Sequence, residues 1–275
     1  MKFVPWLLAA VPLGLLYMDP LRSLVTQWSQ DPNYSHGFLV PLVSAYYLWD
    51  RRMVLKNVPR TAPVPLGYGI LLGSLGLYVI GRMGDEMFTV RLSFLGVLAG
   101  VVLVLAGAQW YRHVRFAIFY LIFMFPLPYF LYNEIAVPLK LFAAKVSTAA
   151  LHAMNYTILR EGNVLTLPGL TLEVADACSG MRSLISVLAL AAAIGWFFHR
   201  KGWCRVTLLV LGVPIAVGVN VVRIIATGIL AHHFGPETAQ GFFHEFAGLV
   251  IFSVALALLF VASFALGRLE RRTAE

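Results

Sequence analysis

Residues 173–198 read EVADACSGMRSLISVLALAAAIGWFF, so a thiol and a cation stand where an apolar run begins. The run from 180 to 198 approaches the roughly 20 residues that a transmembrane helix needs. Cys178 and Arg182 are four positions apart, and they share a face if the helix has begun by Cys178. A fixed guanidinium beside a thiol favours the thiolate over the thiol. The stretch therefore predicts a membrane helix with a nucleophile at its end.

The small residues around Cys178 agree with this interpretation, but a simpler one exists. Ser179 and Gly180 keep the backbone open, as a nucleophile that meets a bulky chain requires. In the simpler interpretation, Cys178 packs as a small hydrophobic residue and Arg182 extends to the lipid headgroups. For an isolated cysteine the simpler interpretation is the more common one, so the choice depends on the rest of the chain.

The composition of the whole chain excludes an ordinary soluble domain. Hydrophobic residues make up 60% of the 275 residues and charged residues only 12%, which is about half the usual charged fraction. The net charge of +8 could suggest nucleic acid, but most Lys and Arg fall in short clusters between apolar runs, as membrane topology requires. Two distant cysteines do not form a disulfide framework. We expect an all-α membrane protein that contacts the lipid bilayer and no nucleic acid.

Eight apolar runs are candidate transmembrane helices. They cover residues 3–18, 36–49, 64–81, 92–109, 116–132, 180–198, 206–230 and 246–266. The second run is short and has to begin at Tyr34 or earlier to cross a bilayer. The first has no convincing cleavage site after it, so we interpret it as an uncleaved span and not as a signal peptide. Without a repeat or a separate soluble segment, residues 1–275 are expected to form one polytopic membrane domain of about eight helices.

The charges of the connecting segments alternate along the chain. Basic clusters stand near Lys2, in the loop 51–60, near Arg112, in the loop 200–205 and in the tail after Arg268. Most acidic residues fall in the loops between these clusters. By the positive-inside rule, both termini are cytoplasmic, whereas the long segment 133–177 and the loop around 231–245 lie outside.

The outer segment has two predicted elements. In residues 135–156, polar residues recur at helical intervals against Leu, Phe and Ala, which predicts an amphipathic helix on the outer surface of the membrane. In residues 164–174, apolar and polar residues alternate around Pro168–Gly169, which predicts a small β-hairpin. A lone hairpin is marginally stable, so we expect it to rest on the membrane or cover the site before the helix of Cys178.

Helical rise brings three distant residues to one depth. Counted at 1.5 Å per residue from the inner basic residues, Cys178, Arg223 and His244 all lie about 27–36 Å away, near the outer surface. An arginine within an apolar run costs roughly 2.5–3.5 kcal/mol, so Arg223 should face the bundle interior or a wet cavity, with Asn220 on the same face. The alternatives are a snorkelling anchor for Arg223 and, for His244 taken alone, a satisfied interfacial histidine.

Cys, His and Arg at one depth favour acyl transfer. A thiolate attacks a carbonyl, a histidine returns a proton to the leaving amine, and an arginine holds the oxyanion or positions the substrate. The chain has no Gly-x-Ser-x-Gly elbow. His244–Glu245 lacks the second histidine of a zinc protease, because position 248 is Gly, and the pair His232–His233 is a weak metal signal. We expect catalytic roles for Cys178, Arg223 and His244, with no metal and no cofactor.

Four motifs of the chain resemble those of the exosortases and of the related archaeosortases. They are ACSGMRS at 177–183, NVVRI at 220–224, FHEFAG at 243–248 and DPNYSHGFLVP at 31–41. The resemblance covers nearly the whole chain in order. It implies a multi-pass cysteine protease or transpeptidase of the bacterial inner membrane, with Cys178 as nucleophile, Arg223 and His244 as its partners, and the active site facing the periplasm.

The resemblance also implies a class of substrate. The substrates would be membrane-anchored proteins that end in a short Pro-Glu-Pro-like motif, an apolar span and a basic tail, and their cleavage would serve export or attachment in the cell envelope. Such a tail presents its motif at the outer interface, which is the depth inferred for Cys178.

Several residues of these motifs are expected to bind the substrate or support the site. They are Arg182, Asn220, His36, Ser179 and Glu173. His36 belongs on the outer side, where it either assists the reaction or anchors the chain at the interface.

Two functions of other classes stay open. The chain could be a transporter with Arg223 and His244 in its path, or a scaffold of an envelope polysaccharide system. A transporter usually places its polar groups near the bilayer midplane, often between inverted repeats. Here they gather near the outer end, so the sequence favours the enzyme.

Overall fold

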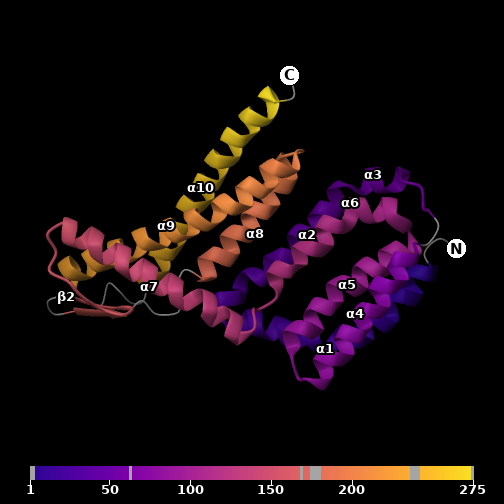
Figure 1. Ribbon diagram of the computed structural model, residues 1–275, viewed down its shortest axis with the longest axis horizontal. Coiled ribbons are helices and arrows are strands. Elements are labelled where there is room, and N and C mark those ends of the chain that lie inside the picture. The colour runs from indigo at the N-terminus through magenta and orange to yellow at the C-terminus, as the bar shows by residue number, and fades with distance from the viewer. Residues whose placement is uncertain (1–3, 62–63, 168–169, 174–180, 236–241, 274–275) are drawn as a thin grey trace. The chain divides into compact units, whose positions relative to one another are not determined.

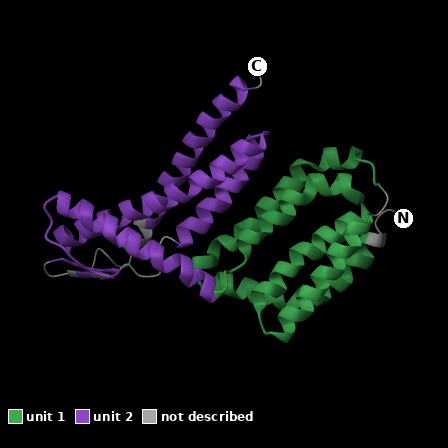
Figure 2. Ribbon diagram, viewed as in Figure 1, with its two compact units in different colours: residues 1–128 green, residues 129–275 purple. Residues whose placement is uncertain are grey.

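The structure is a computed structural model that describes residues 4–61, 64–167, 170–173, 181–235 and 242–273 (Figure 1). It divides into two compact units, Met1–Pro128 and Tyr129–Glu275 (Figure 2). Both units are built mainly from helices, as predicted for an all-α membrane protein. We predicted a single membrane domain over residues 1–275. The division into two units does not test that expectation, which stays a prediction.

The described part of the first unit consists mainly of helices. Its α-helices are α1 (Val4–Gln30), α2 (Leu39–Asp50), α3 (Arg52–Asn57), α4 (Pro65–Met83), α5 (Met87–Leu105) and α6 (Gly107–Tyr120), and its 3₁₀ helices are η1 (Pro32–Phe38) and η2 (Leu121–Met124).

Glycines allow α4 and α5 to pack closely against each other. A Cβ added at Gly100 of α5 would lie 2.8 Å from the backbone nitrogen of Leu71 on α4. At Gly67 of α4, it would lie 2.8 Å from the Cβ of Leu103. Small residues are typical of helix contacts within membranes, where close backbone approach replaces the hydrophobic effect as a source of attraction.

The second unit contains four long helices and a small sheet. Its elements are α7 (Tyr129–Ala153), β1 (Leu159–Glu161), β2 (Val164–Leu167), β3 (Leu170–Glu173), α8 (Met181–Phe198), α9 (Gly202–Phe234) and α10 (Phe242–Arg272). The strands pair antiparallel in the order β1-β2-β3. The predicted hairpin at 164–174 is confirmed, and β1 adds a third strand that was not predicted.

The sheet is anchored in an apolar core beside α9. Leu165 and Leu167 of β2 are buried and pack in one cluster with Leu151 of α7 and with Val221 and Ile224 of α9. The cluster fixes the sheet against the stretch of α9 that carries Arg223.

Seven helices of the described chain are long and apolar enough to cross a membrane. They are Trp6–Gln30, Pro65–Met83, Met87–Leu105, Tyr129–Ala153, Met181–Phe198, Gly202–Phe234 and Gly248–Arg272. The apolar runs 64–81, 180–198, 206–230 and 246–266 are therefore confirmed as helices. The first predicted span, 3–18, continues through Pro12 and Pro20 to the end of α1.

Three predicted spans differ from the structure. The run 36–49 becomes η1 followed by α2, whose 12 residues rise only about 18 Å. The run 92–109 is interrupted after Leu105, because the chain turns at Gly107 with φ of +83°. The run 116–132 is not one helix, since α6 ends at Tyr120 and α7 begins at Tyr129 after two prolines.

The predicted outer helix at 135–156 corresponds to α7. It begins six residues earlier than predicted, and its 25 residues also meet the length and hydropathy of a transmembrane span. Its position on the outer surface of the membrane stays a prediction.

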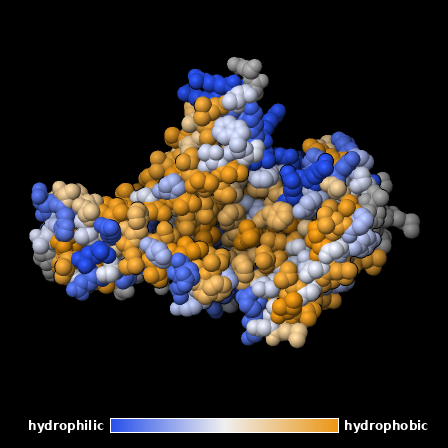
Figure 3. Space-filling model, viewed as in Figure 1, coloured by the Kyte–Doolittle hydropathy of each residue, from blue (hydrophilic) through white to orange (hydrophobic). Residues whose placement is uncertain are grey.

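The outer faces of the helices are apolar, as contact with lipid requires. Large side chains such as Leu8 of α1 and Val261 of α10 are 71% and 66% exposed. On the face shown in Figure 3, apolar residues cover the flanks of the helices and hydrophilic residues gather near the C-terminal end of α10.

Candidate active site

Arginine and small polar residues from two helices face a common cavity. The cavity has a volume of about 380 Å³ and lies among α8, α9 and α10. Its polar lining consists of Arg182, Ser183 and Ser186 from α8 and Asn220 and Arg223 from α9. Asn220 is 4% exposed, and both arginines are half-buried. The remaining lining is apolar apart from Gly248 and consists of Val187, Val219, Leu249, Ile251, Phe252 and Ala255.

Helical spacing explains why these side chains meet. Arg182 and Ser186 are four positions apart on α8, and Asn220 and Arg223 are three positions apart on α9, so each pair occupies one face of its helix. An arginine within an apolar segment is costly where it meets lipid, and a cavity lined by protein avoids that cost. The structure thus places Arg223 as its energetics predicted.

Close packing of α8 and α9 brings the two faces together. Gly212 of α9 faces α8, where an added Cβ would lie 3.3 Å from Leu188 and 3.4 Å from the Cβ of Ala191. Further toward the turn between the helices, a Cβ at Gly195 would lie 3.3 Å from the Cα of Arg205. Polar side chains near the other end of the pair therefore share one space.

A comparison with protein families identifies the kind of membrane protein that carries this cavity. The family model described as transmembrane exosortase matches residues 28–261. The chain belongs to the transmembrane exosortase family. Two further comparisons, one with curated proteins and one with solved structures, gave no match. Exosortases are multi-pass membrane proteins, generally cysteine transpeptidases, and they act on membrane-anchored protein substrates.

The structure brings together three of the predicted site residues of this exosortase. Arg182, Asn220 and Arg223 all line the cavity. Cys178 and Ser179 lie outside the described residues, and Cys178 precedes the first residue of α8 by three positions in the sequence.

Three further predicted residues are described in part or lie elsewhere. His244 belongs to α10, one helical turn before the lining residue Gly248, but its side chain is outside the described part. The same holds for the side chain of Glu173, which ends β3. His36 belongs to η1 in the first unit, where its Nε2 lies 3.1 Å from the backbone oxygen of Phe123.

Sequence reasoning missed two hydroxyl groups of the cavity. Ser183 and Ser186 line it beside Arg182, and the spacing of four between Arg182 and Ser186 was the signal that could have identified one of them. Serine in a membrane helix commonly bonds its own backbone, so it gives a weaker signal than arginine.

An apolar groove adjoins the cavity. It has a volume of about 480 Å³, and the described residues that line it are apolar or glycine: Pro214, Ile215, Gly218, Val219, Val222, Ile251, Val254 and Leu258. Val219 and Ile251 line both spaces, so the groove leads along α9 and α10 into the polar cavity. Gly218 is exposed, and a Cβ there would meet no atom within 4 Å.

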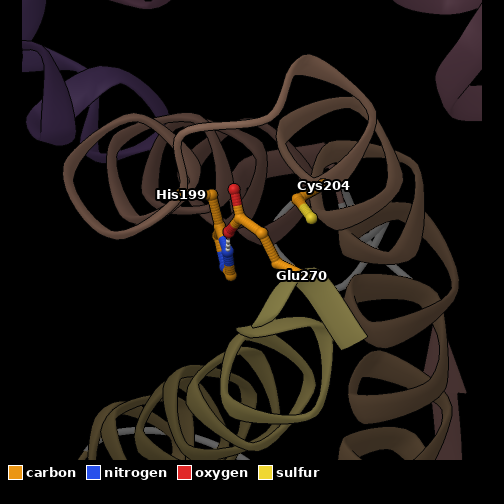
Figure 4. Close-up of side chains that lie close together, drawn as sticks. All are labelled: His199, Cys204 and Glu270. Carbon is orange, nitrogen blue, oxygen red and sulfur yellow. Dashed lines mark hydrogen bonds and ion pairs between the residues drawn. The ribbon is translucent and has the colours of Figure 1, made fainter. Parts of the chain in front are cut away.

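A second polar cluster of this exosortase lies at the turn 199–201, which joins the end of α8 to the beginning of α9. The C-terminal end of α10 also reaches this turn. His199, Cys204 and Glu270 form it (Figure 4). Nδ1 of His199 lies 3.0 Å from Oε2 of Glu270, and its Nε2 lies 2.9 Å from Oγ of Ser263. Oε1 of Glu270 accepts hydrogen bonds from the backbone N–H groups of residues 200 and 201 at 3.0 and 2.6 Å. The carboxylate therefore joins α10 to the turn between α8 and α9.

The composition of this His199 cluster is compatible with a metal ion, but hydrogen bonding already accounts for it. The ligand atoms of His199, Cys204 and Glu270 lie within 4.8 Å of one another, and imidazole, thiolate and carboxylate are all zinc ligands. Both imidazole nitrogens and both carboxylate oxygens have hydrogen-bond partners, which is how buried polar groups are usually satisfied. We interpret the cluster as a structural clamp.

Proposed function

We propose that this exosortase uses Cys178 as a nucleophile to cleave C-terminal sorting signals of membrane-anchored proteins, as a transpeptidase or a peptidase. The observation that carries the proposal is the cavity that Arg182, Asn220 and Arg223 share. It lies near the beginning of α8, and Cys178 precedes that helix by three positions in the sequence. Permanently charged donors within a cavity of low polarity are the groups that an acyl-transfer site needs.

The proposed reaction begins with attack by the thiolate. Sγ of Cys178 forms a bond to the scissile carbonyl carbon, and the carbonyl oxygen becomes an oxyanion that the planar guanidinium of Arg223 stabilises. The C–N bond then breaks while His244 donates a proton to the leaving amine, which leaves a thioester on Cys178. Water or an acceptor amine attacks the thioester, releases the product and returns the thiol.

Helical geometry supports the participation of His244. It precedes Gly248 by four positions on α10, so the two residues lie on the same side of the helix one turn apart. Gly248 lines the cavity. The position of His244 one helical turn before this lining residue supports its part in the proposed reaction.

Charge distribution supports a periplasmic site in a bacterial inner membrane. α10 ends with the basic residues Arg268, Arg271 and Arg272, which the positive-inside rule assigns to the cytoplasm. The cavity lies beside Gly248, twenty positions before Arg268 and so about 30 Å from it along the helix. Cleavage would therefore take place near the outer surface of the membrane.

The groove beside the cavity supports a membrane-spanning substrate. Its lining on α9 includes Pro214, Gly218 and Val222, spaced by four on one face, and the glycine among them leaves the backbone of α9 open to close approach by a second helix. The apolar span of a sorting signal in this groove would place the residues before the span at the polar cavity. The groove thus fits the helix of a substrate anchor.

Conversion of a substrate in cells tests the proposal. The exosortase would be expressed together with a tagged protein that ends in motif, apolar span and basic tail, and conversion to the shortened form followed by immunoblot. We expect conversion with the wild-type protein and with Cys204→Ala, and none with Cys178→Ala at matched abundance. Normal conversion by Cys178→Ala would overturn the proposal.

A further inference from the structure

The first unit has a basic hollow that the proposed reaction does not use. It has a volume of about 700 Å³ and is lined by residues of α3, of the segment after it and of α6: Arg52, Leu55, Lys56, Val58, Pro59, Arg60 and Trp110. We name these residues the basic hollow. Three of the seven are cations, and none of these described lining residues is acidic.

Hydrogen bonds hold the chain of the basic hollow against the corner between α5 and α6. Nε1 of Trp110 donates to the backbone oxygen of Val58 at 3.2 Å. The backbone N–H of Thr61 donates to the backbone oxygen of Ala106 at 3.3 Å. Gly107, with φ of +83°, admits this contact because a Cβ there would collide with the hydroxyl of Thr61. The walls of the hollow are thus fixed in place by the fold itself.

Tryptophan rings accompany the cations. The guanidinium of Arg60 lies 5.9 Å from the ring of Trp110 and 6.0 Å from the ring of Trp6. The guanidinium of Arg52 lies 4.1 Å from the ring of Trp49. Tryptophan is enriched at the level of the lipid headgroups, where its ring is apolar and its N–H can find a polar partner. The hollow therefore has the composition of a membrane interface.

Apolar residues surround the charged part. Leu55, Val58 and Pro59 form part of the lining, and Met53 and Val54 of α3 are 59% and 46% exposed. A small anion from solution would bind through the cations alone. A lipid needs cations for its phosphate and apolar surface for its chains, and the hollow offers both.

We propose that the basic hollow binds the headgroup of an anionic phospholipid. The phosphate would lie among Arg52, Lys56 and Arg60, the acyl chains would follow the exposed apolar residues of α3, and the lipid would belong to the leaflet that the loop 51–60 faces. By the distribution of basic clusters this is the cytoplasmic leaflet.

Native mass spectrometry of the full chain tests the proposal. The protein would be purified in a neutral detergent and titrated with phosphatidylglycerol or with phosphatidylcholine. We expect phosphatidylglycerol to bind more tightly, and the variant Lys56→Gln/Arg60→Gln to lose about tenfold or more in that affinity, because each cation near an anionic lipid contributes roughly a factor of five. All three cationic side chains are exposed, so the variant should fold, which its elution on gel filtration would check.

A matched variant separates the hollow from general charge. Arg271→Gln/Arg272→Gln removes two exposed cations at the end of α10 and should leave phosphatidylglycerol binding unchanged. An equal loss in both double variants, or no preference between the two lipids, would overturn the proposal. Inorganic phosphate provides the last arm: displacement of the lipid by phosphate in the low millimolar range would identify a free-anion site and not a lipid site.

Discussion

Arg182 of α8 and Arg223 of α9 line one cavity, although each belongs to a separate helix. A guanidinium group in an apolar segment is costly in contact with lipid, and a cavity lined by protein lowers that cost for both arginines. A peptide carbonyl that becomes an oxyanion is a suitable ligand for one of them, and the polar backbone before the scissile bond is suitable for the other. The pairing therefore agrees better with chemistry at the cavity than with two independent anchors.

Substitution of Arg223 by Lys should nearly abolish processing although the charge is kept. An ammonium group on a flexible stem does not reproduce the planar donors of a guanidinium, and loss of one oxyanion donor costs about 10²–10³ in rate. Pulse-chase labelling of a co-expressed substrate would measure the rate. Arg268→Lys, a change of the same kind at an exposed position of α10, should be silent. Full activity of Arg223→Lys would make Arg223 an anchor.

Filling the apolar groove should slow processing without affecting the cavity. Gly218→Leu places a side chain where the groove is open, so a substrate helix would be held off α9 and conversion should fall by roughly tenfold or more, the effect of about 1.4 kcal/mol of binding. Gly73→Leu on α4 is the control, because a Cβ at Gly73 also meets no atom within 4 Å. Equal rates for both variants would show that the substrate helix binds elsewhere.

Long apolar runs could be predicted as helices, but the points at which some of these runs are divided could not. Runs such as 180–198 and 206–230 became α8 and α9, and Pro214 within the second run did not end its helix. Pro12 and Pro20 did not end α1, since neighbouring groups in a membrane bundle can satisfy the freed backbone. At the turn, Ala106 and Gly107 contact Thr61 from another part of the chain, and apolar composition alone overlooks the glycine that follows the end of α5.

The candidate site was predictable to the extent that charge in an apolar segment is conspicuous. Arg223 and Asn220 were identified from their spacing and from the cost of burying a cation, and in the structure both line one cavity. The hydroxyls of Ser183 and Ser186 were missed because serine costs little in a helix. Neither the groove nor the basic hollow was predicted, because no charge within an apolar run marks either of them.

The predicted topology can be tested by chemical labelling in intact cells. In a background of Cys178→Ser/Cys204→Ala, a cysteine at Asn57 should be protected from an impermeant thiol reagent, and a cysteine at Glu161 should react. Both positions are exposed, so access through the membrane and not burial decides the result. Labelling with the opposite pattern would contradict the orientation derived from the basic clusters.

Removing the charge of Glu270 should destabilise the second unit, whereas Cys204 should be dispensable. Glu270→Gln weakens the contacts to His199 and to two backbone N–H groups, and lost hydrogen bonds to a charged group cost about 1.5–3 kcal/mol. Thermal unfolding in detergent would show a lower midpoint than for Glu161→Gln on the exposed strand β1. Cys204→Ala should retain processing. Stoichiometric zinc in the purified protein, lost in both Cys204→Ala and Glu270→Gln, would contradict the structural clamp.

The carboxylate of Glu86 should make the stability of the first unit depend on pH. Glu86 caps α5, where its side chain accepts hydrogen bonds from the backbone N–H groups of Phe88 at 3.0 Å and Thr89 at 2.6 Å. Partial burial acts to raise the pKa of Glu86, but these hydrogen bonds and the charge of Arg91 outweigh it and hold the pKa below its usual value. Because the folded-state pKa is depressed, the stabilisation is complete above the pKa of an unfolded glutamate and disappears as the pH falls through the lower, folded value.

Comparison of unfolding between pH 7 and pH 3 would test this cap. Glu86→Ala should lower the free energy of unfolding at pH 7 by about 1 kcal/mol, a typical value for the loss of a capping side chain. Near pH 3 the difference from the wild type should shrink, because protonation also weakens the cap. Asp50→Ala, which removes an exposed carboxylate at the end of α2, should show no such convergence. A difference between Glu86→Ala and the wild type that is the same at both pH values would mean that the carboxylate charge does not stabilise α5.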